Sequence, residues 1–178
     1  NCIRTIPHLR AWDATYRDGQ TPWDKGAPAP PLTEFFESGG TFSGRILVPG
    51  CGRGHDARTL ARCPGTSVTG LDISPTAIAE AKTLAGHEGL QGIEFVVANL
   101  FDLPTHWAAS FDWVVEHTCL SGLHPSLRPR YFEAVTSALK PGGNLFAIWF
   151  TNPDMDPGET GPPFGISKAE IASFTAGK

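Results

Sequence analysis

The sequence predicts an α/β protein whose core is a Rossmann-like, doubly wound and mostly parallel sheet. From Arg45 onward, short apolar runs typical of buried strands alternate with longer segments typical of helices. Helices of this length allow right-handed crossovers between parallel strands, and such helices cover both faces of the sheet. The glycine-rich stretch "PGCGRG" directly follows the first apolar run, at the place where sheets of this kind bind ligands.

Composition and charge favour a single domain over residues 1–178. The chain has 178 residues, of which 40% are hydrophobic, enough for one buried core and short for two. Its net charge of −4 and its interspersed basic residues argue against nucleic acid as a partner. No apolar run approaches the roughly 18 residues that a membrane span needs, so we expect no membrane partner.

The cysteines and histidines show no metal or disulfide spacing. We therefore expect no bound metal and a reducing, cytoplasmic location. We also expect a monomer that acts on a small molecule. Because the sequence begins with Asn rather than Met, we expect N-terminal sequence to be missing from it.

The N-terminal part is expected to contain two helices joined by an ordered loop. Residues 8–17 form a helical pattern with Trp12 and Tyr16 one turn apart on the same face. The following stretch is rich in Gly and Pro, but the large apolar side chain of Trp23 favours an ordered loop over a linker. Residues 32–40 are expected to form a second helix that glycines end.

The rest of the chain is expected to contain five strands, three crossover helices and a short last helix. The expected strands are 45–48, 67–72, 93–98, 111–116 and 144–150. The expected crossover helices are 54–63, 74–86 and 126–143, the last ended by glycines. Ser74 as N-cap, with Pro75 after it, favours the start of one helix, and Ser167 favours the start of the last. The fifth strand would leave its outer edge uncovered.

Three glycines at alternate positions, Gly50, Gly52 and Gly54, are expected to let the backbone approach a ligand closely. A dinucleotide-binding turn would have glycine where this chain has His55, so the spacing favours a ligand without a pyrophosphate. Asp72 ends the second expected strand, where its carboxylate can accept both hydroxyl groups of a ribose. The turn "NLFD" after the third strand offers a pocket edge for an adenine. These features together indicate a nucleoside site; a turn that serves only chain reversal is the alternative.

Five stretches of the sequence resemble class I S-adenosylmethionine-dependent methyltransferases of the thiopurine methyltransferase superfamily, closest to its halide and thiol methyltransferase branch. They are "WDATYRDGQTPWDKG" (12–26), "ILVPGCGRGHD" (46–56), "GLDIS" (70–74), "FDWVVEHTCLSGLHPSLRPRYF" (111–132) and "GPPFGIS" (161–167). The first and the last are specific, whereas the glycine turn occurs across all such methyltransferases. The resemblance runs from about residue 10 to the end of the chain.

The resemblance implies the class I methyltransferase fold, a seven-stranded sheet with an N-terminal helical lid over the cofactor and substrate entry beneath that lid. The lid would be residues 1–40, the cofactor-binding core residues 45–150, and the acceptor-side loop and helix residues 151–178. Since only five strands are expected here, we expect the C-terminal strands of that fold to be missing from this sequence.

The resemblance also implies S-adenosyl-L-methionine as cofactor and S-adenosyl-L-homocysteine as product. Aromatic residues of the lid would surround the methionine end of the cofactor, the glycine turn and Asp72 would hold its backbone and ribose, and the turn after the third strand its adenosine. The implied cofactor-binding residues are Trp12, Tyr16, Trp23, Leu32, Gly50, Cys51, Gly52, Asp72, Ile73, Asn99, Leu100 and His117.

The implied reaction is in-line transfer of a methyl group to a small soft nucleophile, such as a thiol, sulfide or halide. An aromatic face within about 6 Å attracts a sulfonium cation by roughly 0.5 to 2 kcal/mol, which suits the lid; a cluster that only packs is the alternative. A thiol with a pKa around 8.5 reacts as its thiolate and needs a base. His117, just past the fourth strand, is the candidate catalytic residue; a histidine that only contacts the cofactor is the alternative.

Other features near His117 are given lesser roles. Glu116 can orient it, but adjacent residues that leave a strand usually diverge. Cys119 is expected to pack and not to act as a nucleophile, and the "GPPF" segment at 161–164 is expected to shape the acceptor pocket.

The alternative functions are a thiopurine- or metalloid-directed methyltransferase of the same superfamily, a non-catalytic S-adenosylmethionine-binding module, and a nicotinamide-dependent reductase.

Overall fold

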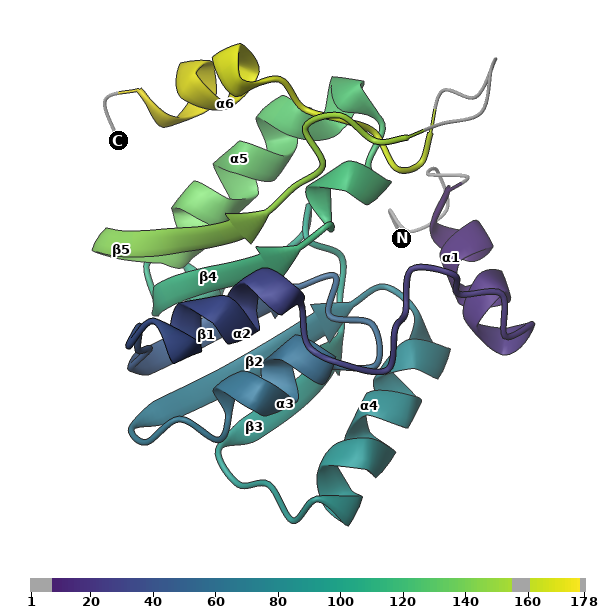
Figure 1. The fold of residues 1–178 in the computed structure, drawn as a ribbon, viewed down its shortest axis with the longest axis vertical. Helices are drawn as coiled ribbons and strands as arrows, with labels where there is room; N and C mark the ends of the chain where they lie inside the picture. The colour runs from purple at the N-terminus through teal and green to yellow at the C-terminus, as the bar shows by residue number, and fades with distance from the viewer. Residues whose placement is uncertain (1–7, 155–160, 177–178) are drawn as a thin grey trace.

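A computed structural model describes residues 8–154 and 161–176 of the chain (Figure 1). Within these residues five parallel strands form one sheet in the order β3-β2-β1-β4-β5. The winding reverses between β1 and β4, and the carboxyl ends of these strands are where such sheets bind ligands. The predicted doubly wound, parallel α/β sheet is confirmed. The strands are β1 (Gly44–Pro49), β2 (Thr66–Asp72), β3 (Ile93–Val97), β4 (Phe111–His117) and β5 (Leu139–Ile148).

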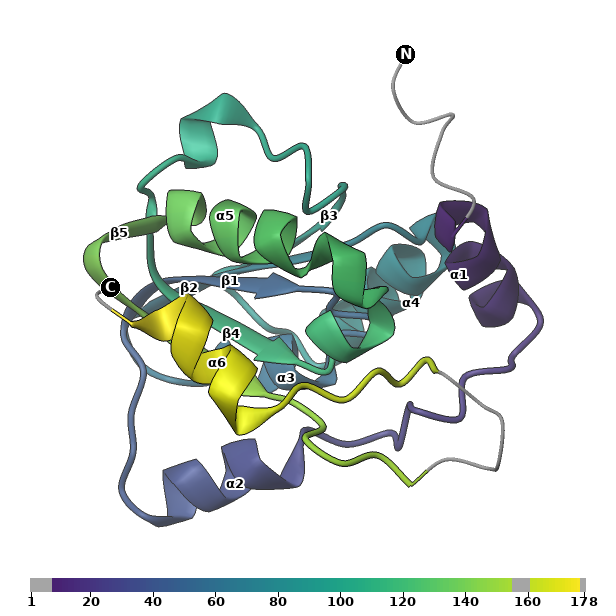
Figure 2. The same ribbon diagram turned by 90° about the horizontal axis from the view of Figure 1, so that it is seen from above.

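Helices cover both faces of this sheet. One face carries α2 (Pro30–Glu37), α3 (His55–Leu60) and α4 (Pro75–His87), and the other carries α5 (Arg128–Ala138) and α6 (Lys168–Thr175). The remaining helix, α1 (His8–Arg17), lies beyond the carboxyl ends of the strands in both views (Figures 1 and 2). The short 3₁₀ turns in the described part of the chain are η2 (Thr105–Trp107), η3 (Leu120–Gly122) and η4 (Pro125–Leu127). None of the described helices is long and apolar enough to cross a membrane.

Alternating side chains of β1 build the two halves of the core. Ile46 and Val48 pack with apolar side chains of α2, α3 and α4, whereas Leu47 packs on the side of α5. All three are at most 3% exposed. Burial on both faces explains why this strand is a continuous apolar run in the sequence and shows no apolar-polar alternation.

The helix starts follow the predicted capping chemistry. The Ser74 hydroxyl accepts the Ala77 amide at 3.1 Å, and Pro75 opens α4. The Ser167 hydroxyl accepts the Glu170 amide at 3.1 Å and opens α6. Both predicted N-caps are confirmed.

The predicted boundary between the fifth helix and the fifth strand is wrong. The helix was expected to continue to the glycines at 142 and 143, but α5 ends at Ala138 and β5 already begins at Leu139. Pro141 accounts for the difference, because proline disfavours helical backbone in the residue before it and cannot donate a helix hydrogen bond. The glycines are therefore part of a longer strand.

The N-terminal helix is fastened to the start of α4 by Asp13. One carboxylate oxygen of Asp13 accepts the Ser74 hydroxyl at 2.7 Å and the Thr76 amide at 3.1 Å. These hydrogen bonds, that from Ser74 foremost, hold the pKa of Asp13 below its usual range. Because α4 follows β2, this contact places α1 next to the carboxyl end of the sheet.

The aromatic cluster under α2 offers a test of the core. Phe42 is 3% exposed and packs against the rings of Trp113 at 4.8 Å and Phe35 at 5.1 Å. We expect Phe42→Ala to lower the free energy of unfolding by about 3–5 kcal/mol through the cavity it leaves. Phe150→Ala is the matched control, because Phe150 is 45% exposed. Urea unfolding curves measure both, and similar losses in the two variants would contradict this description of the core.

Candidate functional site

The turn after β1 brings its backbone close to other parts of the chain. Gly50, Gly52 and Gly54 have φ values of +62°, +52° and +74°. A Cβ atom at Gly52 would lie 2.6 Å from the Tyr16 hydroxyl oxygen, and one at Gly50 would lie 2.9 Å from the Cys119 sulfur. The turn is therefore packed so closely against these two side chains that only glycine fits at either position.

Asp72, at the carboxyl end of β2, holds this turn in place. Its two carboxylate oxygens accept the amides of Gly52 and Ser74, each at 2.9 Å. The side chain is buried, and burial raises the pKa of Asp72. Each carboxylate oxygen has a further lone pair, so the group can hold the turn and still accept a hydroxyl group.

The three aromatic residues predicted in the N-terminal part come together. The Trp23 ring lies edge-on to those of Trp12 and Tyr16, with centroid distances of 5.3 and 6.0 Å. The Tyr16 hydroxyl, which the Trp23 indole N–H approaches at 3.4 Å, reaches the glycine turn. Burial, with the nearby charge of Asp72, raises the pKa of Tyr16. The Trp12 ring lies against Gly122 of the turn that follows β4.

Charged side chains of the glycine turn bind the N-terminal part. The Arg53 guanidinium contacts Asp24 at 2.7 Å and also pairs with Glu80 of α4. His55 Nε2 lies 2.9 Å from the other oxygen of Asp24. Although burial opposes the effect, hydrogen bonds from Arg53 and the Gly26 amide hold the pKa of Asp24 below its usual range. His55, which stands where a dinucleotide-binding turn would have glycine, thus contacts the N-terminal part, as does Arg53.

His117 ends β4 next to the glycine turn and is paired with a carboxylate. The register of Leu47 with Val114 in the β1–β4 pair sets the end of β4 level with the start of the turn. His117 Nδ1 lies 3.0 Å from Asp56 Oδ2, and the other oxygen of Asp56 accepts the Ala29 amide at 2.7 Å. The side chains of His117 and Asp56 are 35% and 13% exposed.

Asp56 is a site residue that sequence reasoning missed. It is part of the motif "ILVPGCGRGHD", but no role was assigned to it. The signal that would have identified it is the placement of the first turn of α3 against the end of β4, which the sequence pattern does not give.

Glu116 turns away from His117, as expected for adjacent residues that leave a strand. Its side chain is fully buried, and one oxygen accepts the Leu120 amide at 3.1 Å. The other oxygen has no hydrogen-bond partner within the described residues. Burial raises the pKa of Glu116 to about 8. Its contacts fix the turn after β4 and do not orient His117.

The turn after β3 lies beside Asp72. The Ala98 amide donates to the Asp72 carbonyl at 3.0 Å, and the Asn99 side-chain oxygen accepts the Phe101 amide at 2.9 Å. Ile73, next to Asp72, is half-buried. The structure therefore brings Asn99 and Ile73 to the same end of the sheet as the glycine turn.

Three further residues that are predicted to contact the cofactor have side chains in the core or backbone groups that already form hydrogen bonds. Leu32 and Leu100 are 0% and 7% exposed and belong to the two halves of the core, so their side chains do not face an open cleft. The Cys51 amide donates to the Leu71 carbonyl at 2.9 Å, and its carbonyl accepts the Gly54 amide at 2.8 Å. Burial raises the pKa of the Cys51 and Cys119 thiols. Cofactor contacts by these residues stay predictions.

The "GPPF" segment packs onto the turn after β4. The Phe164 amide donates to the Ser121 carbonyl at 2.7 Å, and the Phe164 ring lies 5.7 Å from the ring of His124. Since Trp12 contacts Gly122 of the same turn, the segment lies near the aromatic cluster. Its role in acceptor binding stays a prediction.

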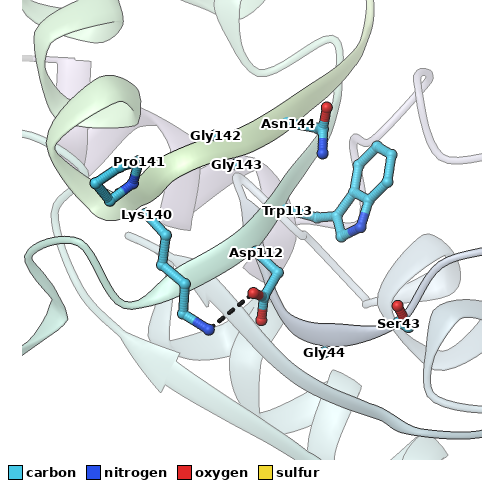
Figure 3. A pocket seen from close by; sticks show the side chains of 9 residues that line it. All are labelled: Ser43, Gly44, Asp112, Trp113, Lys140, Pro141, Gly142, Gly143 and Asn144. Atoms are coloured by element: carbon cyan, nitrogen blue, oxygen red, sulfur yellow. Dashed lines mark hydrogen bonds and ion pairs between the residues drawn. The ribbon is translucent and has the colours of Figure 1, made fainter.

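A separate hollow lies at the opposite end of the sheet, by the amino ends of β1 and β4 (Figure 3). It has a volume of about 220 Å³, and Lys140 Nζ bonds the Asp112 carboxylate at 2.8 Å on one side of it. None of the predicted site residues lines it. Among the described residues no cluster of three or more His, Cys, Asp and Glu side chains is arranged to hold a metal ion.

The known proteins that match this chain agree with one another in the family that they indicate. The family model of thiopurine S-methyltransferase matches residues 8–178. Probable thiol methyltransferase 2 of Arabidopsis thaliana is 34% identical over 160 residues, 89% of this chain and 68% of that protein. Thiocyanate methyltransferase 1 of Brassica oleracea is 32% identical over 159 residues, 88% of this chain and 67% of that protein. The chain spans about two thirds of the length of these relatives.

A solved structure is also similar over nearly the whole chain. It comes from work on the conversion of a disulfide bond into a thioacetal group during echinomycin biosynthesis. It aligns with a TM-score of 0.80 and 29% identity, covering 95% of this chain and 77% of that one. These matches confirm the resemblance drawn from the sequence motifs.

The burial of Glu116 predicts that the free energy of unfolding depends on pH. Its pKa is about 8 in the folded chain against an ordinary value of 4.5, so between these values the folded chain keeps a proton that the unfolded chain has lost. Stability should therefore fall as pH rises through this window, by at most about 1.4 kcal/mol per pH unit, and Glu116→Gln should remove that fall. Urea unfolding between pH 5 and pH 8 tests this. The exposed Glu133→Gln is the control, and parallel stability profiles for wild type and Glu116→Gln would contradict it.

Proposed function

The chain belongs to the thiopurine S-methyltransferase family and is an S-adenosylmethionine-dependent methyltransferase, and we propose that it methylates a small soft nucleophile, namely a thiol, sulfide or halide. One observation carries the proposal. The glycine turn, Asp72, the aromatic cluster and His117 converge at the carboxyl ends of β1, β2 and β4. The family assignment does not favour a nicotinamide-dependent reductase or a non-catalytic binding module.

The residues at this end of the sheet fit an adenosyl amino acid. Gly50 is exposed and carries no side chain, so the backbone is open to a ligand there. Asp72 has the spare acceptor capacity that ribose hydroxyl groups require. We propose that Gly50, Gly52, Asp72, Ile73 and Asn99 hold the nucleoside part, with the backbone of Cys51. For Leu32 and Leu100 we propose that they support the pocket from behind, since both are buried.

S-adenosylmethionine supplies a methyl group carried on a sulfonium cation. The gathering of the Trp12, Tyr16 and Trp23 rings beside the glycine turn supports a role for this cluster in attracting that cation, because aromatic faces are electron-rich. We propose that the cluster also excludes water once the cofactor is bound, which would strengthen electrostatic interactions at the reacting centre. We propose that residues 1–40 form a lid that carries this cluster over the core at 45–150.

His117 is proposed as the catalytic residue. Its ring is 35% exposed at the end of β4, so a bound acceptor has access to it. The turn that follows it contacts Trp12, and the same turn accepts the Phe164 amide of the segment at 161–164. We propose that this segment, as part of an acceptor-side region at 151–178, shapes the acceptor pocket.

The proposal also covers the oligomeric state, the location and the partners of the protein. We propose a single domain that acts as a cytoplasmic monomer on a small-molecule acceptor, without nucleic acid or membrane partners. The net charge of −4 and the free thiols of Cys51, Cys63 and Cys119 support this setting.

A labelled-methyl screen tests the proposed acceptors. We expect transfer from labelled S-adenosylmethionine to at least one of iodide, hydrosulfide and an aromatic thiol, because these are soft nucleophiles. A thiopurine and tellurite are included to detect other acceptors of the superfamily. The protein should also bind S-adenosylhomocysteine and not NAD in calorimetry. Binding without any transfer would instead support a non-catalytic module.

A His117→Ala variant tests the catalytic role. We expect thiol methylation to fall by about 100-fold or more, with little change in the affinity for S-adenosylhomocysteine, because the imidazole acts on the acceptor. Steady-state kinetics and calorimetry measure the two quantities, with the exposed His87→Ala as control. Equal losses of rate and affinity would mean that His117 is only a cofactor contact.

A further inference from the structure

We propose that Asp56 is a positioning residue that fixes His117 as a proton acceptor, and that the enzyme therefore prefers acceptors that arrive protonated, thiols above all, over halide and other anions that carry no proton. This inference rests on the proposed function and names the substrate class within it.

The pairing of the two side chains determines which ring nitrogen is free. A carboxylate only accepts hydrogen bonds, so His117 Nδ1, at 3.0 Å from Asp56 Oδ2, carries a proton. In the neutral imidazole the lone pair is then on Nε2. Within residues 8–154 and 161–176 the structure records no other hydrogen bond to this side chain. The ring thus presents a proton-accepting nitrogen on its open side.

Asp56 is itself held firmly. It lies in the first turn of α3, and its second oxygen accepts the Ala29 amide at 2.7 Å. With 13% of the side chain exposed, the carboxylate has little freedom to rotate. The same group therefore joins three parts of the chain: the segment before α2, the helix after the glycine turn, and the end of β4.

Other titratable groups near His117 do not serve this role. Glu116 faces the opposite side of β4, where it accepts the Leu120 amide. The Cys119 thiol lies against Gly50, and burial raises its pKa. Asp24 and Arg53 bind each other. Among the residues that the structure describes, Asp56 is the charged group that contacts the imidazole.

The proton transfer balances without any further reactant. The S–H bond of the acceptor breaks, its electron pair stays on the acceptor sulfur, and the proton goes to His117 Nε2. Asp56 then faces an imidazolium, whose charge it stabilises. The thiolate sulfur uses its electron pair to bond the methyl carbon while the bond between that carbon and the sulfonium sulfur breaks. The electron pair of the broken bond stays on that sulfur, so S-adenosylhomocysteine leaves uncharged at sulfur, and the imidazolium later releases its proton to solvent.

The same arrangement gives no advantage to a halide. Such an anion needs no proton removed, and the carboxylate behind the imidazole opposes its approach by like charge. The names of the two plant relatives include both acceptor types, a thiol and the thiocyanate anion. The Asp56–His117 pair favours the protonated type for this chain.

The test uses Asp56→Asn with an alkyl thiol, 2-mercaptoethanol, and with iodide. The amide oxygen can keep the Ala29 hydrogen bond, but the amide N–H donates to Nδ1 and moves the ring proton to Nε2. We expect the kcat for the thiol at pH 7 to fall by about 100-fold or more. The rate should recover toward pH 9.5, where the thiol ionises by itself. Iodide methylation should not fall and should rise to the extent that the like charge of Asp56 opposed the anion, whereas S-adenosylhomocysteine affinity should change little.

Asp24→Asn is the matched control. Asp24 is another partly buried carboxylate that accepts a backbone amide, and it lies 2.9 Å from a histidine nitrogen, that of His55. This variant should leave the ratio of thiol to iodide rates and the shape of the pH profile unchanged, even if lid closure alters both rates together.

Nitrogen NMR of the histidine ring provides a readout independent of turnover. The neutral His117 ring of the wild type should show Nε2 as the unprotonated nitrogen, and Asp56→Asn should reverse this. A wild-type ring with unprotonated Nδ1, or equal loss of thiol and iodide rates in Asp56→Asn with an unchanged pH profile, would overturn the inference. If the wild type methylates neither acceptor, the proposed function fails, and the preference for thiols fails with it.

Discussion

The buried bond from the Gly52 amide to the Asp72 carboxylate is the contact on which the candidate site depends. It joins the turn after β1 to the end of β2 across 20 residues of sequence, at 2.9 Å. A buried carboxylate is costly unless it is hydrogen-bonded, and here backbone amides satisfy both oxygens. The turn is thereby fixed in the shape that leaves Gly50 open. The Tyr16 hydroxyl then reaches this fixed turn, so the aromatic cluster depends on the same contact.

Two carboxylates of the N-terminal part attach it to the core. Asp13 holds α1 to the start of α4, and Asp24 holds the following loop to Arg53 and His55. Both attachments use carboxylates of the N-terminal part and donors of the core. In the aromatic cluster, Trp12 directly precedes the first attachment, whereas Tyr16 and Trp23 lie between the two, and Trp23 stays 40% exposed.

Much of the fold could be predicted, because each strand and helix has a local pattern and local caps such as Ser74. The end of α5 could not, since the glycines at 142 and 143 resemble a helix stop and the pairing of Leu139 with Phe111 is a long-range contact. The same distinction holds for the site. Asp72 is recognisable from its place after a strand, whereas the Asp56–His117 contact spans 61 residues and follows only from how α3 sits against β4.

The second oxygen of Asp56 gives the N-terminal part a direct connection to the chemistry. The amide of Ala29 and the imidazole of His117 bind opposite oxygens of one carboxylate. A shift of the backbone at Ala29 would rotate that carboxylate and change its alignment with the ring. The alignment of His117 as a proton acceptor is therefore coupled to the packing of the backbone before α2 on the core.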